Sequence, residues 1–221
     1  MRTQSLVVSK ESVFAKPYWG YDDFGIFLVV LVLLTLMFRL CVRFHLLAAS
    51  ELVHPTTGLQ SAVVAFVSLA LYLVLKLRHQ QPVLRPLGWV LPRPCHMFVA
   101  LLGGVALATT VAIYLRARHQ STPTVPVLDF ALLALIFGPV LEESLFRGCL
   151  LPLLAQTTGA VVAVILTAFC FALFHGPTDL PHWMSFTATG FAYGWMRATS
   201  RSTAAAALMH ASYNLTLFLL S

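Results

Sequence analysis

Two adjacent glutamates and an arginine lie inside one of the most apolar stretches of the chain, G-P-V-L-E-E-S-L-F-R-G at residues 138–148. Glu143 and Arg147 are four residues apart, with the acid on the N-terminal side, which is the favourable order for an ion pair on one helical face. Glu142 points about 100° away from Glu143 and lacks that partner. The spacing therefore predicts one paired glutamate and one glutamate that is available for chemistry.

Two histidines follow in later apolar stretches. His175 ends the segment F-A-L-F-H at residues 171–175, and His210 lies four residues before Asn214 on the same helical face. Polar and ionisable side chains in membrane helices normally face the bundle interior and have partners there. A carboxylate and two imidazoles on three different helices can meet only around a shared polar cavity, so we expect Glu142, His175 and His210 to line one.

These side chains are suited to hydrolysis. Glu142, assisted by His175, could take a proton from a water molecule that attacks a peptide carbonyl. His210 and Asn214 could donate hydrogen bonds to the oxyanion that develops. Glu142, His175 and His210 also make up a two-histidine, one-glutamate ligand set for zinc, with a fourth position for water. The sequence does not separate the two mechanisms, so zinc stays open as a cofactor.

The composition defines the surroundings of these residues. Of 221 residues, 59% are hydrophobic and 10% are charged, which is too little polar surface for a water-soluble protein of this size. We expect an all-α, polytopic transmembrane helical bundle of about seven to eight spans, forming a single integral membrane domain over residues 1–221. The net charge of +6 does not indicate nucleic-acid binding, because the basic residues gather between apolar runs, where topology and anionic membrane lipids explain them.

Apolar runs separated by polar, proline and glycine residues are expected to form the membrane helices. They cover about residues 24–43, 58–77, 97–115, 127–154, 159–174, 183–196 and 203–220. Lys and Arg concentrate in alternate connections, above all at residues 76–94, which favours a cytoplasmic N-terminus. In the sixth run, Gly190 and Gly194 form a small-xxx-small pattern that predicts close helix packing within the bundle.

Three motifs occur in order along the C-terminal half: E-E-x-x-x-R at 142–147, F-x-x-x-H at 171–175 and H-x-x-x-N at 210–214. Together they resemble the signature of the CPBP family of CAAX prenyl proteases and bacteriocin-processing enzymes. The resemblance covers roughly residues 131–215 and implies a CPBP-like catalytic core at 127–221, preceded by N-terminal helices at 1–126. It implies intramembrane endopeptidase activity, with Glu142 activating water and with Glu143, Arg147 and Phe171 in supporting positions.

The resemblance also implies a peptide or protein substrate, prenylated in the CAAX-type enzymes, and a multi-pass membrane protein. The short chain and brief loops favour a prokaryotic cell membrane. Family members are described both as metalloproteases and as metal-free, glutamate-dependent enzymes, so the zinc alternative stays open on this ground too.

The main alternative function is a proton- or ion-coupled transporter that uses the same buried glutamate and histidines as a relay. Transporters usually contain two related halves, whereas the charged positions here all lie in the C-terminal half. A catalytically inactive scaffold is the second alternative, although all three motifs are intact.

Overall fold

The computed structural model describes residues 13–44, 57–120 and 133–220, and all regular secondary structure in these ranges is helical. This confirms the expected all-α fold class. The first helices are α1 (Tyr21–Arg43), α2 (Thr57–His79) and α3 (Pro94–Ala117). A composite helix follows, made of η2 (Leu133–Phe137), α5 (Gly138–Glu143), η3 (Ser144–Leu150) and α6 (Leu151–Thr158), where η2 and η3 are π-helical. The last helices are α7 (Ala160–His175), α8 (Leu180–Ser200) and α9 (Thr203–Leu220).

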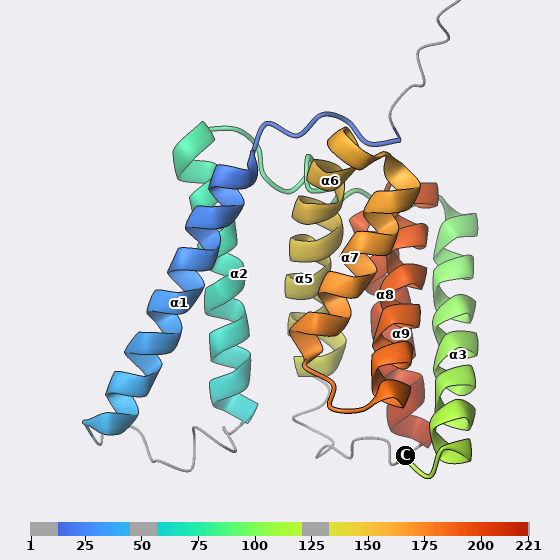
Figure 1. The fold of residues 1–221 in the computed structure, drawn as a ribbon. Coiled ribbons are helices and arrows are strands. Elements are labelled where there is room, and N and C mark those ends of the chain that lie inside the picture. The colour runs from blue at the N-terminus through green and yellow to red at the C-terminus, as the bar shows by residue number, and fades with distance from the viewer. Residues whose placement is uncertain (1–12, 45–56, 121–132, 221) are drawn as a thin grey trace, which may run out of the picture.

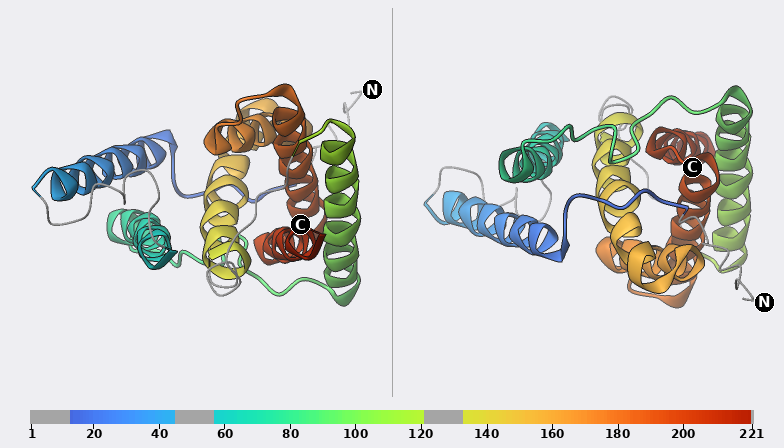
Figure 2. Two further views of the ribbon diagram at one scale, coloured as in Figure 1. Left: turned by 90° about the horizontal axis from the view of Figure 1, so that it is seen from below. Right: turned by 90° about the horizontal axis from the view of Figure 1, so that it is seen from above.

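The helices form two groups that lie side by side. Figure 1 shows α1 and α2 as a hairpin that stands next to the bundle formed by α3 and the helices from η2 to α9. Within the bundle, α9 packs against α3 and α8, and α7 packs against α8. The end views in Figure 2 show the composite helix between α2 and α9. The composite helix therefore separates the hairpin from the rest of the bundle.

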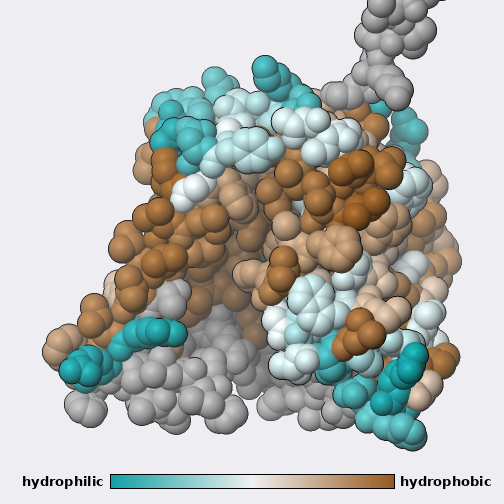
Figure 3. Space-filling model, viewed as in Figure 1, coloured by the Kyte–Doolittle hydropathy of each residue, from teal (hydrophilic) through white to brown (hydrophobic). Residues whose placement is uncertain are grey.

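Three helices in the described part of the chain are long and apolar enough to cross a membrane by length and composition: Tyr21–Cys41 within α1, α3 and α9. α7 is apolar but has only 16 residues. On the face seen in Figure 3, hydrophilic residues gather toward the two ends of the molecule and a broad hydrophobic region lies between them. These features agree with an integral membrane protein, while the number of spans stays a prediction.

The helix ends follow local capping chemistry. The sixth apolar run was expected at residues 183–196, but α8 extends over Leu180–Ser200. It begins earlier because the carboxylate of Asp179 accepts a hydrogen bond from the backbone N–H of His182, which is the usual role of an N-cap aspartate. α7 ends at His175 because the next residue, Gly176, has a φ of +57°, a left-handed conformation that glycine adopts without steric penalty. The run expected from residue 127 begins outside the described residues.

The small residues of α8 allow it to approach α7 closely. A Cβ atom on Gly190 would lie 3.0 Å from the Cα atom of Ala168, and one on Gly194 would lie 3.1 Å from Cγ1 of Val164. Any larger side chain would push the two helices apart. The predicted close packing within the bundle is confirmed, and it brings the backbone of Gly190 near the charged residues of the composite helix.

Candidate active site

The predicted ion pair between Glu143 and Arg147 forms where α5 passes into η3, and both side chains are 0% exposed. Nη1 of Arg147 lies 3.0 Å from Oε1 of Glu143. Nη2 donates a hydrogen bond to the carbonyl oxygen of Gly190 in α8, at 2.7 Å. The guanidinium carbon lies 4.6 Å from the ring centre of Phe171 in α7. The pair therefore connects the composite helix to both α7 and α8.

His210 of α9 binds the same carboxylate. Its Nδ1 atom lies 3.0 Å from Oε1 of Glu143, and its ring stacks on Tyr193 with ring centres 4.6 Å apart. Because an ionised carboxylate can only accept hydrogen bonds, Nδ1 carries a proton and Nε2 is the nitrogen left for another partner. The four-residue spacing predicted a single partner for Glu143, Arg147, whereas the structure gives it two.

Glu142 lies apart from this ion pair and faces His175 at the end of α7. Its Oε2 atom lies 3.7 Å from Nε2 of His175, which is beyond hydrogen-bond distance. The Nδ1–H of His175 donates to the carbonyl oxygen of Phe171 at 2.9 Å, which leaves Nε2 as an acceptor. Oε2 of Glu142 is buried without a hydrogen-bond partner among the described residues. The structure thus brings together the two residues that we expected to activate water.

Aromatic rings hold His175 on two sides. Its ring centre lies 4.4 Å from that of Phe171 and 4.4 Å from that of Phe186 in α8. Phe171 also lies 5.9 Å from the ring of His210, so one phenylalanine contacts both histidines. Sequence reasoning missed Phe186 and Tyr193. They are seven residues apart, and this spacing places them on one face of α8, which is a signal that could have identified them.

Asn214 lies on the side of the composite helix that carries Glu142. Its amide nitrogen donates to the carbonyl oxygen of Ala134 in η2, at 2.7 Å. Ala134, Gly138 and Glu142 follow one another at intervals of four residues on one helical face. The Glu142 carboxylate reaches back along this face, because Oε1 lies 3.9 Å from where a Cβ atom of Gly138 would be. No hydrogen bond in the described ranges joins Asn214 directly to Glu142.

The ligand set considered for zinc does not assemble in this arrangement. Glu142 and His175 face each other, whereas the Nδ1 atom of His210 donates to Glu143, which leaves only its Nε2 atom for a metal ion. Among the described residues, no three His, Cys, Asp or Glu side chains are placed so that they could hold a metal ion together. The residues of the site therefore do not fit a three-ligand zinc centre.

A third acid–histidine contact lies in the connection that follows His175. Asp179 accepts hydrogen bonds from the backbone N–H of His182, at 2.9 Å, and from its Nδ1 atom, at 2.8 Å. These hydrogen bonds, above all the one from the backbone, lower the pKa of the Asp179 carboxyl below its usual value of 3.8. The contact fixes the start of α8, the helix that carries Phe186.

Residues 124–216 match the family model described as Rce1-like, type II CAAX prenyl endopeptidase. The matched range contains all three motifs and runs from before η2 into α9, whereas α1, α2 and α3 lie outside it. No curated protein and no solved structure matches the chain.

Proposed function

Because residues 124–216 match the model of the type II CAAX prenyl endopeptidase Rce1-like family, we propose that this membrane protein is an endopeptidase in which Glu142 and His175 activate water. The family indicates a protease of the CAAX type. The observation that supports the catalytic roles is the pair of acceptor atoms that face each other, Oε2 of Glu142 and Nε2 of His175, at 3.7 Å. Neither atom has a hydrogen-bond partner among the described residues.

Two acceptors that face each other require a donor between them. An ionised Glu142 accepts only, and a His175 ring with its proton on Nδ1 accepts at Nε2. A water molecule can donate one proton to each and remain within about 3 Å of both atoms. Transfer of the water proton to Glu142 would leave a hydroxide that attacks the scissile carbonyl carbon. Glu142 would then pass that proton to the amine that leaves.

We assign His210 and Asn214 to the oxyanion. Asn214 has two amide protons, of which one is donated to Ala134, so the second is available to the oxyanion. His210 donates through Nδ1 to Glu143, so it can serve the oxyanion from Nε2 only when the ring carries both protons. The Glu143 carboxylate is placed to balance the positive charge of that form, and Arg147 holds the carboxylate in position.

The substrate that we propose to test first is a prenylated C-terminal peptide. This choice follows from the family, and it agrees with the apolar helices, since a prenyl chain would concentrate a peptide in the bilayer beside them.

The test is release of the C-terminal tripeptide from a farnesylated CAAX peptide by the purified full-length protein, measured by mass spectrometry. Glu142→Gln keeps the size of the side chain but removes the base, so we expect activity to fall by about 10² to 10⁴-fold. Asp22→Asn removes an exposed carboxylate at the start of α1 and is the matched control, expected to retain activity. Cleavage by Glu142→Gln at the parent rate would show that the catalytic assignment is wrong.

The same preparation separates the peptidase from the transporter alternative. If the parent cleaves neither prenylated nor unprenylated peptides, but takes up a solute in proteoliposomes in response to a proton gradient, the buried residues act as a relay. Cleavage that Glu142→Gln abolishes, without any loss of folded protein on size-exclusion chromatography, supports the enzyme.

A further inference from the structure

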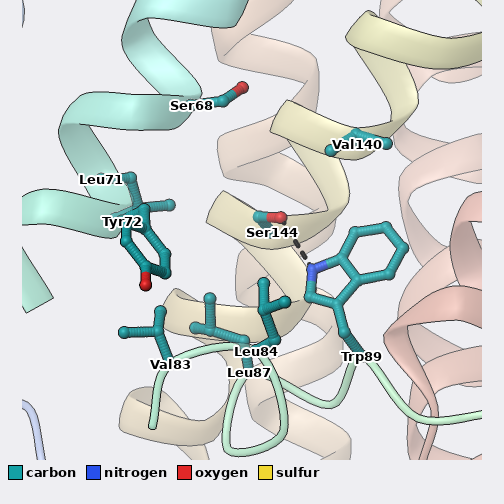
Figure 4. A pocket seen from close by; sticks show the side chains of 9 residues that line it. All are labelled: Ser68, Leu71, Tyr72, Val83, Leu84, Leu87, Trp89, Val140 and Ser144. Atoms are coloured by element: carbon teal, nitrogen blue, oxygen red, sulfur yellow. Dashed lines mark hydrogen bonds between the residues drawn. The ribbon is translucent and has the colours of Figure 1, made fainter. Parts of the chain in front are cut away.

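A cavity of about 350 Å³ lies between α2, the connection after it and α5 (Figure 4). Its walls include Ser68 and Leu71 of α2, Val83 of the connection and Val140 of α5. Val140 and Glu142 are two residues apart, so their side chains point about 200° apart around the helix. The cavity is therefore a separate feature, on the side of α5 away from the candidate active site.

The cavity offers hydrocarbon contacts and few free polar groups. The hydroxyl of Ser68 donates to the carbonyl oxygen of Val64 at 2.8 Å. The hydroxyl oxygen of Ser144 accepts from the indole N–H of Trp89 at 2.9 Å, as Figure 4 shows. A peptide in this space would leave backbone N–H and C=O groups without partners, which is unfavourable in an apolar site. An alkyl chain has no such groups, and the volume is in the range of known ligand pockets.

Basic residues are close in sequence to the residues that line the cavity. Arg85 is exposed and directly follows Leu84, which lines the cavity, and it makes no ion pair among the described residues. Lys76 and Arg78 lie at the adjoining end of α2, where Arg78 is bound to Asp22 and Asp23. A hydrocarbon-lined space whose lining segment carries an exposed arginine matches a lipid with a negatively charged headgroup.

The surroundings of the cavity are those of a lipid-facing surface. Figure 3 shows a recessed hydrophobic surface between the α1–α2 hairpin and the bundle. On α2, Leu69 and Leu73 are 49% and 39% exposed, and α1 exposes a series of large apolar side chains. Groups of this kind are stable in contact with acyl chains and unfavourable in water.

From these observations we infer that the cavity binds one acyl chain of an anionic phospholipid, with the headgroup phosphate at Arg85. The bound lipid fills the space between α2 and α5 and so supports the helix that carries Glu142. This role does not depend on the proposed peptidase activity, because it concerns a different face of α5.

The first test is native mass spectrometry of the full-length protein with phosphatidylglycerol and phosphatidylcholine of identical acyl chains. Ser68→Phe places a ring in the cavity, and we expect about a tenfold loss of bound phosphatidylglycerol, the change that displacing roughly two methylene groups would produce. Leu69→Phe adds a ring to the neighbouring exposed position and should bind as the parent does. Equal lipid retention by both variants would overturn the inference.

A second variant, Val140→Phe, fills the cavity from its other wall and keeps the test valid if Ser68→Phe fails to fold. Arg85→Gln removes the positive charge that we propose to bind the headgroup. It should lower the binding of phosphatidylglycerol but not that of phosphatidylcholine. Arg93→Gln, at the start of α3, is its matched control. If Arg85→Gln binds both lipids as the parent does, or if a farnesylated peptide displaces the lipid from the cavity, the assignment to an anionic phospholipid is wrong.

Discussion

The described part of the chain contains two clusters in which one carboxylate binds both an arginine and a histidine. In the hairpin, Asp23 of α1 lies 2.6 Å from Nε of Arg78 and 3.0 Å from Nε2 of His79. In the bundle, Glu143 lies 3.0 Å from both Arg147 and His210. Both carboxylates are buried, but the arginines differ: the side chain of Arg78 is 40% exposed and that of Arg147 is 0% exposed.

This difference in exposure indicates different roles for the two clusters. The cluster around Asp23 joins α1 to α2, whereas the cluster around Glu143 positions His210. Arg78 keeps part of its hydration, and without it the buried Asp23 would still have His79 and the backbone N–H of Gly20 as partners, so this ion pair contributes less net stability. Arg147 has lost its hydration and depends on Glu143, on the carbonyl of Gly190 and on the ring faces around it. The buried cluster around Glu143 therefore holds His210 in one orientation. The cluster around Asp23 holds its partners less firmly, because the side chain of Arg78 is 40% exposed.

The largest expected effect is that of Arg147→Ala. It leaves Glu143 buried beside His210 without its main counter-charge, so we expect a loss of about 3–5 kcal/mol in the free energy of unfolding. Arg78→Ala is the matched variant of the outer cluster, and its loss should stay below about 1 kcal/mol. Chemical unfolding in detergent measures both. Equal losses would show that burial is not what distinguishes the two clusters.

The double variant Glu143→Leu with Arg147→Met sharpens the same comparison. Replacing a buried ion pair with apolar residues of similar size is often neutral for stability, so much of the lost free energy should return. Peptidase activity should not return, because His210 has lost the acceptor of its Nδ1 proton.

A smaller effect is expected from Phe186→Leu, which removes one of the two rings that hold His175. A ring pair contributes about 0.5–1.5 kcal/mol beyond its buried area, so kcat should fall by up to about tenfold. Phe191→Leu is the control on the same helix, since Phe191 is 42% exposed and stacks on Trp195 instead. An unchanged kcat in Phe186→Leu would remove Phe186 from the positioning of His175.

The smallest effect concerns Asp179, an acid–histidine contact without an arginine. Its pKa in the folded protein lies below the usual value of 3.8, so its contribution is complete above that value and is lost as the pH falls through the folded pKa. The midpoint of thermal unfolding of the parent should therefore fall more steeply below about pH 4 than that of Asp179→Asn. Asparagine also caps helices, so both proteins should be similar at pH 7. If the unfolding midpoints of the parent and of Asp179→Asn fall equally with pH, the Asp179 carboxylate does not contribute to stability in this way.

The sequence predicted one of the two partners of Glu143, Arg147, but not the other, His210. The spacing of Glu143 and Arg147 identified a pair on one helix, because neighbours four residues apart must lie on one face. The contact between His210 and Glu143 spans 67 residues, and a helical pattern indicates which face a side chain occupies but not which helix lies opposite. Asp23 and His79 lie at the ends of apolar runs, where no spacing links residues 56 positions apart.

The fold was predictable at the level of helices and less so in their detail. The apolar runs correspond to the described helices, and the seventh run matches α9 at both ends. The π-helical segments were not predicted, because periods of 3.6 and 4.4 residues cannot be separated over segments as short as η2 and η3.

The π-helical turn of η3 has a consequence for changes in chain length. A π-helical turn contains about one residue more than an α-helical turn, and η3 begins directly after Glu143 and contains Arg147. Deleting a single residue after Arg147 would let the seven residues of η3 relax to six residues of ordinary α-helix, which rotates the flanking segments by only about 30° relative to each other, instead of the roughly 100° that a deletion from an α-helix produces. The composite helix should therefore tolerate a deletion in this part of η3 better than one in α5 or α6, and a deletion scan across it should show a smaller loss of folded protein there than in the flanking α-helical segments.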